Sequence, residues 1–474
     1  ERLLTRLQSI KVFDPACGSG NFLIIAYKEL RRIEMAVFEA MEALSGGDAK
    51  PIVPDDQDEM FAKPGQQKLA APSGQQEIFM SGIRLSQLYG IEIDDFAHEI
   101  AQLSLWLAEH QMNAAFRERF GHAEPALPLG QSGNIVKGNA LRLDWISVCP
   151  KTSDDEVYVC GNPPFNGANS RTAEQNADMA NVFKGFKKFK YLDFVTCWHW
   201  LGTQYIAGSS AELAFVSTNS ICQGEQTAMI WPAILGKGVH IHFAYQGFQW
   251  RNSAADNAGV HVVIIGLSAS HTGKRRLFRL DGKSWYEESV SGISPYLLPG
   301  SNTVVGSRTS SFSDVPPMIY GNKPVDGGHL ILSSDEKDRL TTQHPETEPW
   351  IKRLMGADEF IKGKLRYCLW LVDVPEQAFM AVPPVAARIE KTKEARLASQ
   401  DAGARKLADR PHTFRDINNP NSFLIVPSVS SERRFYAPIG FFESDVIPTN
   451  RNYVIPDAGY YEFGILSSVC ICLG

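Results

Sequence analysis

The sequence predicts an α/β fold for the first part of the chain and a structurally different region after it. Up to about residue 268, short β-branched or apolar runs alternate with stretches of helical periodicity, a pattern typical of a parallel sheet with crossover helices on both faces. Beyond that point the alternation stops, and shorter apolar runs appear among many prolines and glycines. We therefore expect a first domain over residues 1–268 and a mixed α+β region over residues 269–474.

Strands are predicted where a short apolar or β-branched run is bounded by turn residues. They span residues 11–14, 88–93, 134–137, 157–160, 213–217, 239–245 and 260–267. Helices begin near Asn21, Asp94 and Tyr191. The second helix carries apolar residues in helical spacing, at Phe96, Ile100, Leu103 and Leu107.

Two further features complete this first domain. Its last two strands follow each other without a helix, which predicts an antiparallel hairpin at the sheet edge. Residues 45–82 are rich in Pro, Gln, Gly, Asp and Lys with little periodicity, which predicts a loop insertion. In the second region, apolar runs at 367–374, 423–426 and 453–455 are interrupted by one long helical pattern over residues 385–407.

The composition narrows the class of protein. The chain has 474 residues, 44% of them hydrophobic, so it can bury a substantial core. We find no apolar run of about 18 residues and no secretion signal, so we expect a cytoplasmic protein that does not contact the membrane. The eight cysteines form no CxxC pair, and His240, His242 and His261 lie in strand patterns where imidazoles are more often packed than ligating. We assign no metal.

The net charge of -6 argues against a surface that binds phosphate everywhere, but a nucleic-acid enzyme needs only one basic face. Two basic clusters could supply one. The first interleaves lysines with phenylalanines, at Lys184, Lys187, Lys188 and Lys190. The second lies on the long helical pattern, at Arg388, Lys391, Lys393, Arg396, Arg405 and Lys406. A solvated helix face explains each cluster equally well.

The segment from Asp14 to Phe22, DPACGSGNF, follows the first strand and opens a helix. Its glycines allow the backbone to approach a ligand closely. The segment lacks the GxGxxG spacing and the P-loop lysine, which disfavours a phosphate-bearing cofactor. Glu92 ends the next strand, where an acid can accept hydrogen bonds from ribose hydroxyls, although acids are also favoured beside the start of a helix.

The most informative segment is Asn162-Pro163-Pro164-Phe165, directly after an apolar strand. An exocyclic aromatic amine is a poor nucleophile, and two acceptors that bind its N–H groups would favour a more tetrahedral nitrogen. Asn162 Oδ1 and the Pro163 carbonyl can be these acceptors. The two prolines fix the backbone, and Phe165 offers a face on which a flipped base could stack.

Taken in order, DPACGSGNF, GIEID and GNPPF resemble the motifs of the gamma-class S-adenosylmethionine-dependent DNA amino-methyltransferases. The stretch from Phe423 to Leu466 looks like the target-recognition region of the MmeI-like fused restriction and modification enzymes. The resemblance implies a Rossmann-like methyltransferase sheet with flanking helices, S-adenosylmethionine as the cofactor, and double-stranded DNA with a flipped base as the substrate. Protein partners are not indicated.

The resemblance also implies roles for single residues. The catalytic tetrapeptide falls on Asn162, Pro163, Pro164 and Phe165. The cofactor site falls on Asp14, Ala16, Gly18, Gly20, Phe22, Glu92 and Ile93. Asn139 takes the place of the family's usual Asp after the third strand. Contacts with DNA are expected from Lys187, Lys188, Lys190, Ser430, Arg433 and Arg434.

The chain departs from the family at its start. The motif that lies upstream of the cofactor loop in this class would precede Glu1, and no PD-(D/E)xK-like nuclease pattern is found, so we expect a piece of a longer protein that does not itself cleave DNA.

Our interpretation is an adenine-N6 DNA methyltransferase of a type II restriction-modification system. Three alternatives remain. Cytosine N4 poses the same chemical problem as adenine N6. A protein glutamine amide is also methylated by enzymes with a similar tetrapeptide, although a large second region would be unnecessary for one peptide target. A DNA-specificity module with an inactive methyltransferase half is the third, and the intact tetrapeptide argues against it.

Overall fold

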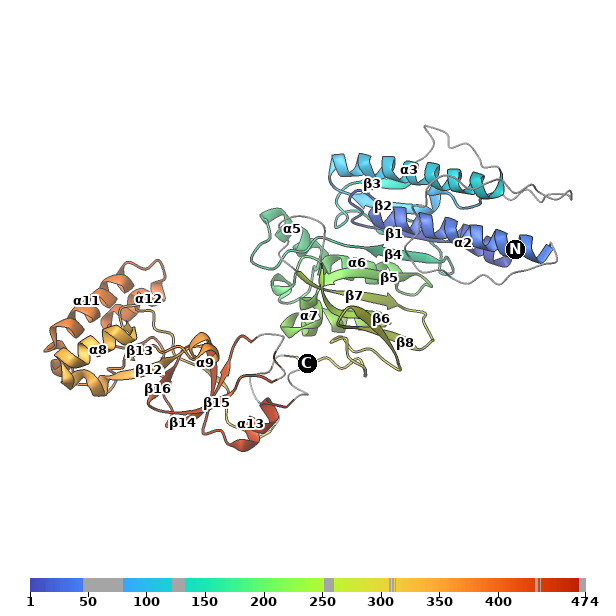
Figure 1. Ribbon diagram of the computed structural model, residues 1–474. Helices are drawn as coiled ribbons and strands as arrows, with labels where there is room; N and C mark the ends of the chain where they lie inside the picture. Colours follow the sequence, from blue (N-terminus) through green and yellow to red (C-terminus); the bar gives the residue numbers. More distant parts are fainter. Residues whose placement is uncertain are drawn as a thin grey trace. The chain divides into compact units, whose positions relative to one another are not determined.

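The computed structural model describes residues 1–45, 80–121, 133–250, 260–306, 308, 311, 313–430, 434 and 436–468. The chain forms two compact units, Glu1–Ser307 and Arg308–Gly474 (Figure 1). Residues 46–79, which make up nearly all of the predicted loop insertion, lie outside the described residues. Within the described ranges, every helix is too short or too polar to cross a membrane.

The first unit is built around one sheet of nine strands in the order β3-β2-β1-β4-β5-β7-β6-β8-β9. Its strands are β1 (Lys11–Asp14), β2 (Leu88–Glu92), β3 (Asn134–Lys137), β4 (Val157–Gly161), β5 (Glu212–Thr218), β6 (His240–Trp250), β7 (Val260–Ser268), β8 (Arg275–Asp281) and β9 (Ser284–Val290). Strands β1 to β5 are parallel, whereas β7 runs antiparallel to both β5 and β6. The predicted α/β class is therefore confirmed.

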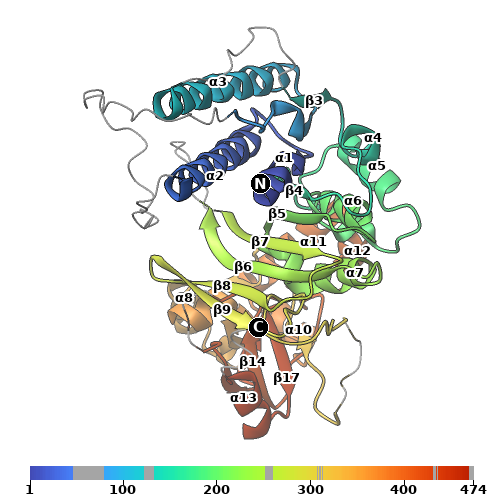
Figure 2. The same cartoon turned by 90° about the vertical axis from the view of Figure 1, so that its right-hand side faces the viewer.

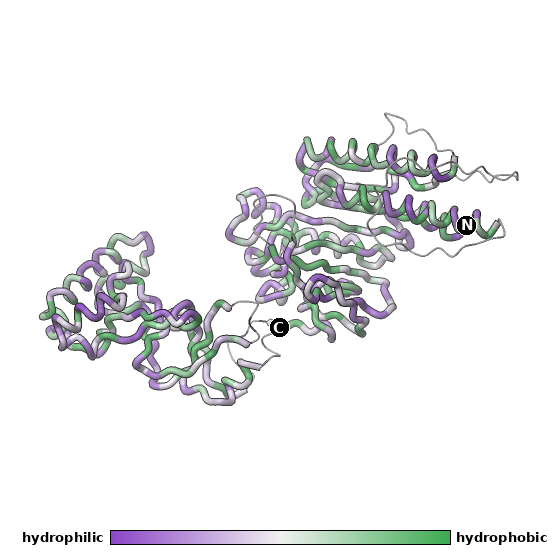
Figure 3. Tube along the Cα trace, viewed as in Figure 1, coloured by the Kyte–Doolittle hydropathy of each residue, from purple (hydrophilic) through white to green (hydrophobic). Residues whose placement is uncertain are grey.

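Helices cover both faces of this sheet. They are α1 (Arg2–Ser9), α2 (Asn21–Ser45), α3 (Asp95–Phe120), α4 (Trp145–Val148), α5 (Ala173–Val182), α6 (Thr196–Ile206) and α7 (Gly224–Leu235), with 3-10 turns η1 (Leu85–Gln87), η2 (Phe189–Tyr191) and η3 (Asn219–Cys222). Neighbouring strand residues point to opposite faces, so Val12 joins the core under α1 to α3, and Phe13 joins the core under α4 to α7. Figure 3 shows the hydrophobic residues concentrated along the central strands.

Two expectations for this unit are corrected. The β6–β7 hairpin exists, but it is not at the edge, because β8 pairs with β6 and β9 pairs with β8 (Figure 2). The boundary predicted after residue 268 therefore falls inside the first unit. The alternation of strand and helix stops there because the sheet continues as antiparallel strands without crossover helices.

Helix α3 does not bury the apolar stripe that the sequence displays. Phe96 is 75% exposed, and Leu103 and Leu107 are also exposed. The helix packs instead through Ala101 and Leu105, which also have helical spacing. The small side chain of Ala101 allows the helix to approach β2 and α2 closely. Periodicity alone did not distinguish the two stripes.

The second unit contains two four-stranded sheets, β10-β17-β14-β15 and β11-β13-β12-β16. Its strands are β10 (Ile319–Tyr320), β11 (Ile331–Leu332), β12 (Ile351–Met355), β13 (Tyr367–Leu369), β14 (Ser422–Pro427), β15 (Gly440–Glu443), β16 (Val446–Pro448) and β17 (Asn452–Pro456). Its helices are α8 (Ser334–Gln343), α9 (Ala357–Lys362), α10 (Glu376–Met380), α11 (Pro383–Leu397), α12 (Ala402–Lys406) and α13 (Tyr460–Leu466), with 3-10 turns η4 (Pro345–Trp350) and η5 (Leu407–Asp409).

The long helix predicted over residues 385–407 is divided into α11 and α12. The division falls at Asp401, whose carboxylate accepts a hydrogen bond from Gly403 N at 2.8 Å and so begins a new helix. The basic cluster on this pattern is divided as well. Arg388 binds Glu336 at 2.6 Å, and Arg396 is buried, so both stabilise the fold. Other members of the cluster, such as Lys391 and Lys393, are exposed to solvent.

Candidate active site

A cavity of about 500 Å³ lies in the first unit where the order of strands reverses, between β1 and its two neighbours β2 and β4. It is lined by the turn after β1, the end of β2, the segment after β3, the end of β4, and residues of and before α5 and α6. Carboxyl ends of parallel strands at such a point are the usual ligand site of an open α/β sheet.

The turn after β1 is held by the side chain of Asp14. Asp14 Oδ1 accepts a hydrogen bond from Ala16 N at 3.0 Å, whereas Oδ2 is buried without a hydrogen-bond partner among the described residues. Burial raises the pKa of Asp14 to about 7. Gly18 has a φ of 54° and open space where a side chain would be, so its backbone can face the cavity.

The acid at the end of β2 lies where the sequence predicted it. Glu92 lines the cavity and accepts hydrogen bonds from Gly18 N at 2.8 Å and from Asp94 N at 2.9 Å. Each carboxylate oxygen keeps a further lone pair for a ligand. Ile93 beside it is exposed and also lines the cavity, whereas Phe22 is partly buried and lies outside the lining.

Asn139 lines the cavity too, but its side chain is already engaged. Its Nδ2 donates to Asp178 Oδ2 at 2.8 Å, and its Oδ1 accepts from Leu141 N at 2.9 Å. Asp178 also accepts from Arg142 Nε at 2.7 Å and is only 3% exposed. Asp178 could not be identified from the sequence, because a single acid in a helical stretch carries no signal of its own.

The Asn162 tetrapeptide follows β4 directly, and both Asn162 and Pro164 line the cavity. Asn162 Oδ1 is buried and has no hydrogen-bond partner among the described residues. Pro163 is buried and Phe165 is partly buried, and neither is part of the cavity lining. A buried acceptor without a partner costs free energy, so its presence at a cavity points to a donor on a ligand.

The segment that continues from the tetrapeptide is fixed to its surroundings. The Asn166 carbonyl accepts from Phe194 N at 2.9 Å, and Asn166 Nδ2 donates to Gln175 Oε1 at 3.2 Å. Gln175 belongs to the capping box of α5. The tetrapeptide is therefore anchored to α5 and to the segment before α6.

Two aromatic residues without a distinguishing sequence signal also line the cavity. Phe194 and Trp198 pack edge to face with ring centroids 5.3 Å apart, and Trp198 Nε1 donates to Pro15 O at 3.1 Å. Aromatic residues are frequent throughout this stretch of sequence, so nothing separated these two from residues of the core.

The first basic cluster lies between α5 and α6, in the segment that also supplies part of the cavity lining. Lys187, Lys188 and Lys190 are exposed, whereas Phe183 is buried in the core, so the aromatic members of this pattern pack the fold. In the second unit, Ser430 and Arg434 are exposed, and Arg433 lies outside the described residues. Contact of these residues with DNA stays a prediction.

The charged residues that line the cavity show whether it suits the expected cofactor. Every charged residue among the described ones that line it is acidic, namely Glu92, Glu174 and Asp178. Arg142 pairs with Glu174 and Asp178, so Glu92 is the lining acid that is left for a ligand. It disfavours phosphates and suits hydroxyl donors. These residues fit S-adenosylmethionine, which carries ribose hydroxyls and no phosphate.

An open sheet of this order, with an acid-lined cavity at the point where the strand order reverses, defines the class of Rossmann-like methyltransferases. The family profile of the MmeI DNA-methyltransferase domain matches residues 1–279, and the profile of the MmeI target recognition domain matches residues 299–472. The chain therefore belongs to the MmeI family of DNA methyltransferases with a target recognition domain.

Two relatives show the extent of the similarity. DNA methyltransferase A of Bacillus subtilis (strain 168) is 42% identical over 470 residues, which are 99% of this chain and 50% of the relative. The solved structure of the Type IIL restriction-modification enzyme MmeI in complex with DNA matches with a TM-score of 0.78 at 36% identity, over 99% of this chain and 59% of that chain. The chain thus spans about half the length of the Bacillus relative. The predicted family and fold are confirmed.

Proposed function

We propose that this chain is the catalytic and recognition part of a site-specific methyltransferase that modifies adenine N6 in duplex DNA within a restriction-modification system. The observation that carries the proposal is the buried, unpaired Oδ1 of Asn162 at an acid-lined cavity. Family membership supports DNA as the substrate. A DNA substrate would also place the protein in the cytoplasm.

The residues around the cavity have separate tasks in holding the cofactor. Glu92 accepts hydrogen bonds from ribose hydroxyls, and Asp14, Ala16, Gly18 and Gly20 shape the turn that faces the methionine part. Phe22 supports this turn, and Ile93 covers the adenine side. Asn139 acts mainly by fixing Asp178, since both of its polar groups are engaged. When bound, S-adenosylmethionine supplies an electrophilic methyl group on a cationic sulfur.

The tetrapeptide acts on the base. Asn162 Oδ1 and the Pro163 carbonyl accept the two N–H groups of the target amine, which frees its lone pair and aims it at the methyl group. Since Asn162 Oδ1 has no competing donor among the described residues, it is available to the base without first breaking a protein hydrogen bond. Pro164 holds the backbone, and Phe165 stacks on the flipped base.

Recognition is assigned to the second unit and to the lysine segment of the first. Lys187, Lys188 and Lys190 would contact phosphates, which position a duplex without reading its sequence. Ser430, Arg433 and Arg434 would contact base edges or phosphates in the recognition region.

The test is transfer of labelled methyl groups from S-adenosylmethionine to mixed-sequence duplex DNA, followed by nucleoside analysis. Asn162→Ala should lower transfer by at least about 100-fold, because one acceptor of the reacting amine is lost, and should leave cofactor binding nearly unchanged. Asn181→Ala, at an exposed position on α5, is the matched control and should behave as the unsubstituted chain.

Each outcome separates the alternatives. N6-methyladenine supports the proposal, and N4-methylcytosine changes only the target base. Label on a protein glutamine in place of DNA, or cofactor binding without any transfer, would overturn it. Equal loss of transfer and of cofactor binding in Asn162→Ala would contradict the role given to Asn162.

A further inference from the structure

A second group of polar side chains lies at the opposite end of the sheet from the cavity. Glu212 is the first residue of β5, whereas the cavity lies at the carboxyl ends of the parallel strands. His242 lies near the start of β6, and His271 lies in the segment between β7 and β8. The register brings them together, because Glu212 pairs with Ser268, and Ser268 pairs with His240.

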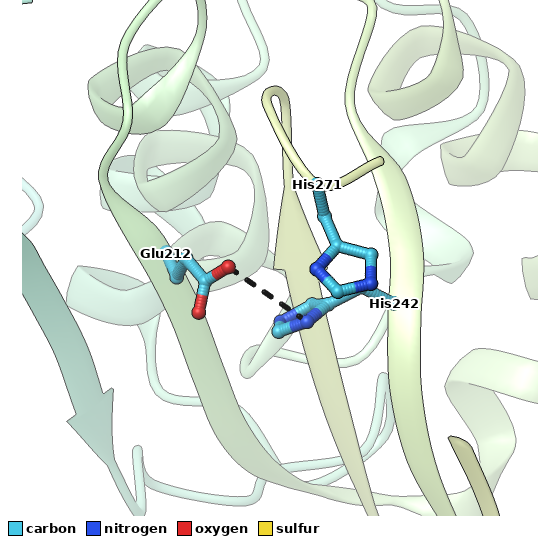
Figure 4. A group of neighbouring side chains, drawn as sticks. All are labelled: Glu212, His242 and His271. Carbon is cyan, nitrogen blue, oxygen red and sulfur yellow. Dashed lines mark ion pairs between the residues drawn. The ribbon is translucent and has the colours of Figure 1, made fainter. Parts of the chain in front are cut away.

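The three side chains converge on one point. One ligand atom from each residue lies within 4.8 Å of the other two, and Figure 4 shows both imidazole rings beside the Glu212 carboxylate. The two ring centroids are 5.1 Å apart. Tetrahedral zinc with bonds of about 2.0–2.1 Å needs ligand atoms roughly 3.3–3.5 Å apart. A rotation of the partly exposed Glu212 side chain, with a small shift of the His271 ring, can close this difference.

His242 is the most buried member of the group. It is 7% exposed, and its Nε2 is buried without a hydrogen bond among the described residues. Its Nδ1 lies 3.9 Å from Glu212 Oε1, which is beyond hydrogen-bond distance. A separation of 3.9 Å is too long for a hydrogen bond, but an ion bonded to both atoms at about 2.0–2.1 Å can bridge it.

His271 is held in position by its neighbours. Ser268 Oγ accepts hydrogen bonds from His271 N at 3.1 Å and from Ser270 N at 3.2 Å. The His271 ring places Nε2 3.3 Å from Lys274 O, so this nitrogen carries the proton and Nδ1 presents its lone pair. A ligating histidine that donates its second N–H to a carbonyl is the common arrangement in metal sites.

The surrounding charges decide which metal fits. The guanidinium groups of Arg275 and Arg276 and the His240 ring lie near His242, and Arg276 also lies near Glu212. These cations disfavour an ion that is bound mainly by electrostatic attraction, such as Mg²⁺ or Ca²⁺. Both of these ions also prefer oxygen ligands. Two imidazoles and one carboxylate suit Zn²⁺ and its neighbours in the first transition row, whose bonds to nitrogen are strong.

We propose that Glu212, His242 and His271 form a binding site for a divalent ion of the zinc type. Three protein ligands leave one position for a water molecule or a small anion. The bound ion connects β5, β6 and the segment between β7 and β8, and so stabilises the antiparallel half of the sheet. The site is separate from the proposed methyl transfer.

The test is a titration of the chain with Co²⁺, which substitutes for Zn²⁺ and has visible d–d absorption. We expect one Co²⁺ per chain, displaced by Zn²⁺ and not by Mg²⁺. His271→Ala and Glu212→Gln should each lower the affinity at least about tenfold, since each removes one of three ligands. His261→Ala, at the other end of β7, is the matched control and should bind Co²⁺ as the unsubstituted chain does.

Thermal unfolding keeps the test independent of folding defects. His271 lies outside the strands, so His271→Ala should unfold at the same temperature as the unsubstituted chain in the presence of a chelator. Added Zn²⁺ should then raise the unfolding temperature of the unsubstituted chain and not that of the variant. The proposal would be overturned by binding without a defined stoichiometry or by unchanged affinity in both ligand variants. A thiolate charge-transfer band would also overturn it, because it would assign the ion to cysteines.

Discussion

At the scale of single residues, Gly161 has a role that its side chain does not reveal. A Cβ at this position would lie 2.4 Å from Asp14 Oδ1. That carboxylate is fully buried and is held by Ala16 N, so it has little freedom to move away. The glycine before Asn162 therefore lets the ends of β1 and β4 approach each other at the proposed active site.

We predict that Gly161→Ala destabilises the first unit by about 1–3 kcal/mol, because the added methyl group overpacks a closed site. Cofactor affinity should fall as well, since the same shift displaces the turn after β1. Chemical denaturation and equilibrium dialysis measure the two effects. Gly247→Ala, on β6 with no atom within 4 Å of the added Cβ, should change neither, and equal effects in both variants would contradict the explanation.

The residues of the candidate site could be predicted from the sequence only where a strand end and a motif coincide. Glu92 and Asn162 each end or follow a short apolar strand, and both line the cavity. Asp178 and Trp198 reach the same cavity from helices, and their approach depends on how α5 and α6 pack on the sheet. Local sequence does not encode that packing, so these residues had no signal.

At the scale of elements, α11 shows that a cluster of basic residues can serve the fold. Arg396 is 1% exposed, and its guanidinium donates to the carbonyls of Val325, Leu407 and Thr413, each at 2.7 or 2.8 Å. It also donates to the carbonyls of Pro324 and Arg410. One side chain thus satisfies backbone acceptors in two loops and attaches both to the helix.

Replacing Arg396 by Met should destabilise the second unit by about 3–5 kcal/mol, because the buried carbonyls lose their donors together. Thermal or chemical unfolding measures this loss. Lys393→Met, an exposed position on the same helix, should shift stability by no more than about 0.5 kcal/mol. A small effect at Arg396 would mean that water replaces the guanidinium readily.

The strands of the first unit were the most predictable elements. β1 and β3 begin and end where the sequence indicated, since short apolar runs bounded by turn residues have few other solutions. Helix α3 was predicted to begin near Asp94, which caps it, but its buried face was not identified. In the second unit, the apolar runs at 423–426 and 453–455 coincide with β14 and β17. The two-residue strands β10 and β11 depend on partners distant in sequence, which local patterns do not show.

At the scale of the whole molecule, each unit has its own hydrophobic cores. We therefore predict two calorimetric unfolding transitions. S-adenosylmethionine at about a hundredfold excess over its Kd should stabilise only the first unit, by roughly 2.7 kcal/mol, and so raise only the unfolding temperature of that unit.

Arg396→Met shows which transition belongs to which unit, because it should lower only the unfolding temperature of the second unit. A single transition that responds to both the ligand and the substitution would show that the two units unfold together.

The extension of the sheet by β8 and β9 has a consequence for chimeras that exchange recognition regions between related enzymes. β8 pairs with β6, and Leu277 of β8 is buried in the core under α4 to α7. A junction after residue 268 would remove this hairpin and leave β6 as a long unpaired edge, which is prone to aggregation. A junction placed after Leu297 and before Arg308 keeps the sheet whole and retains Ile293 and Leu297, which are buried in the same core.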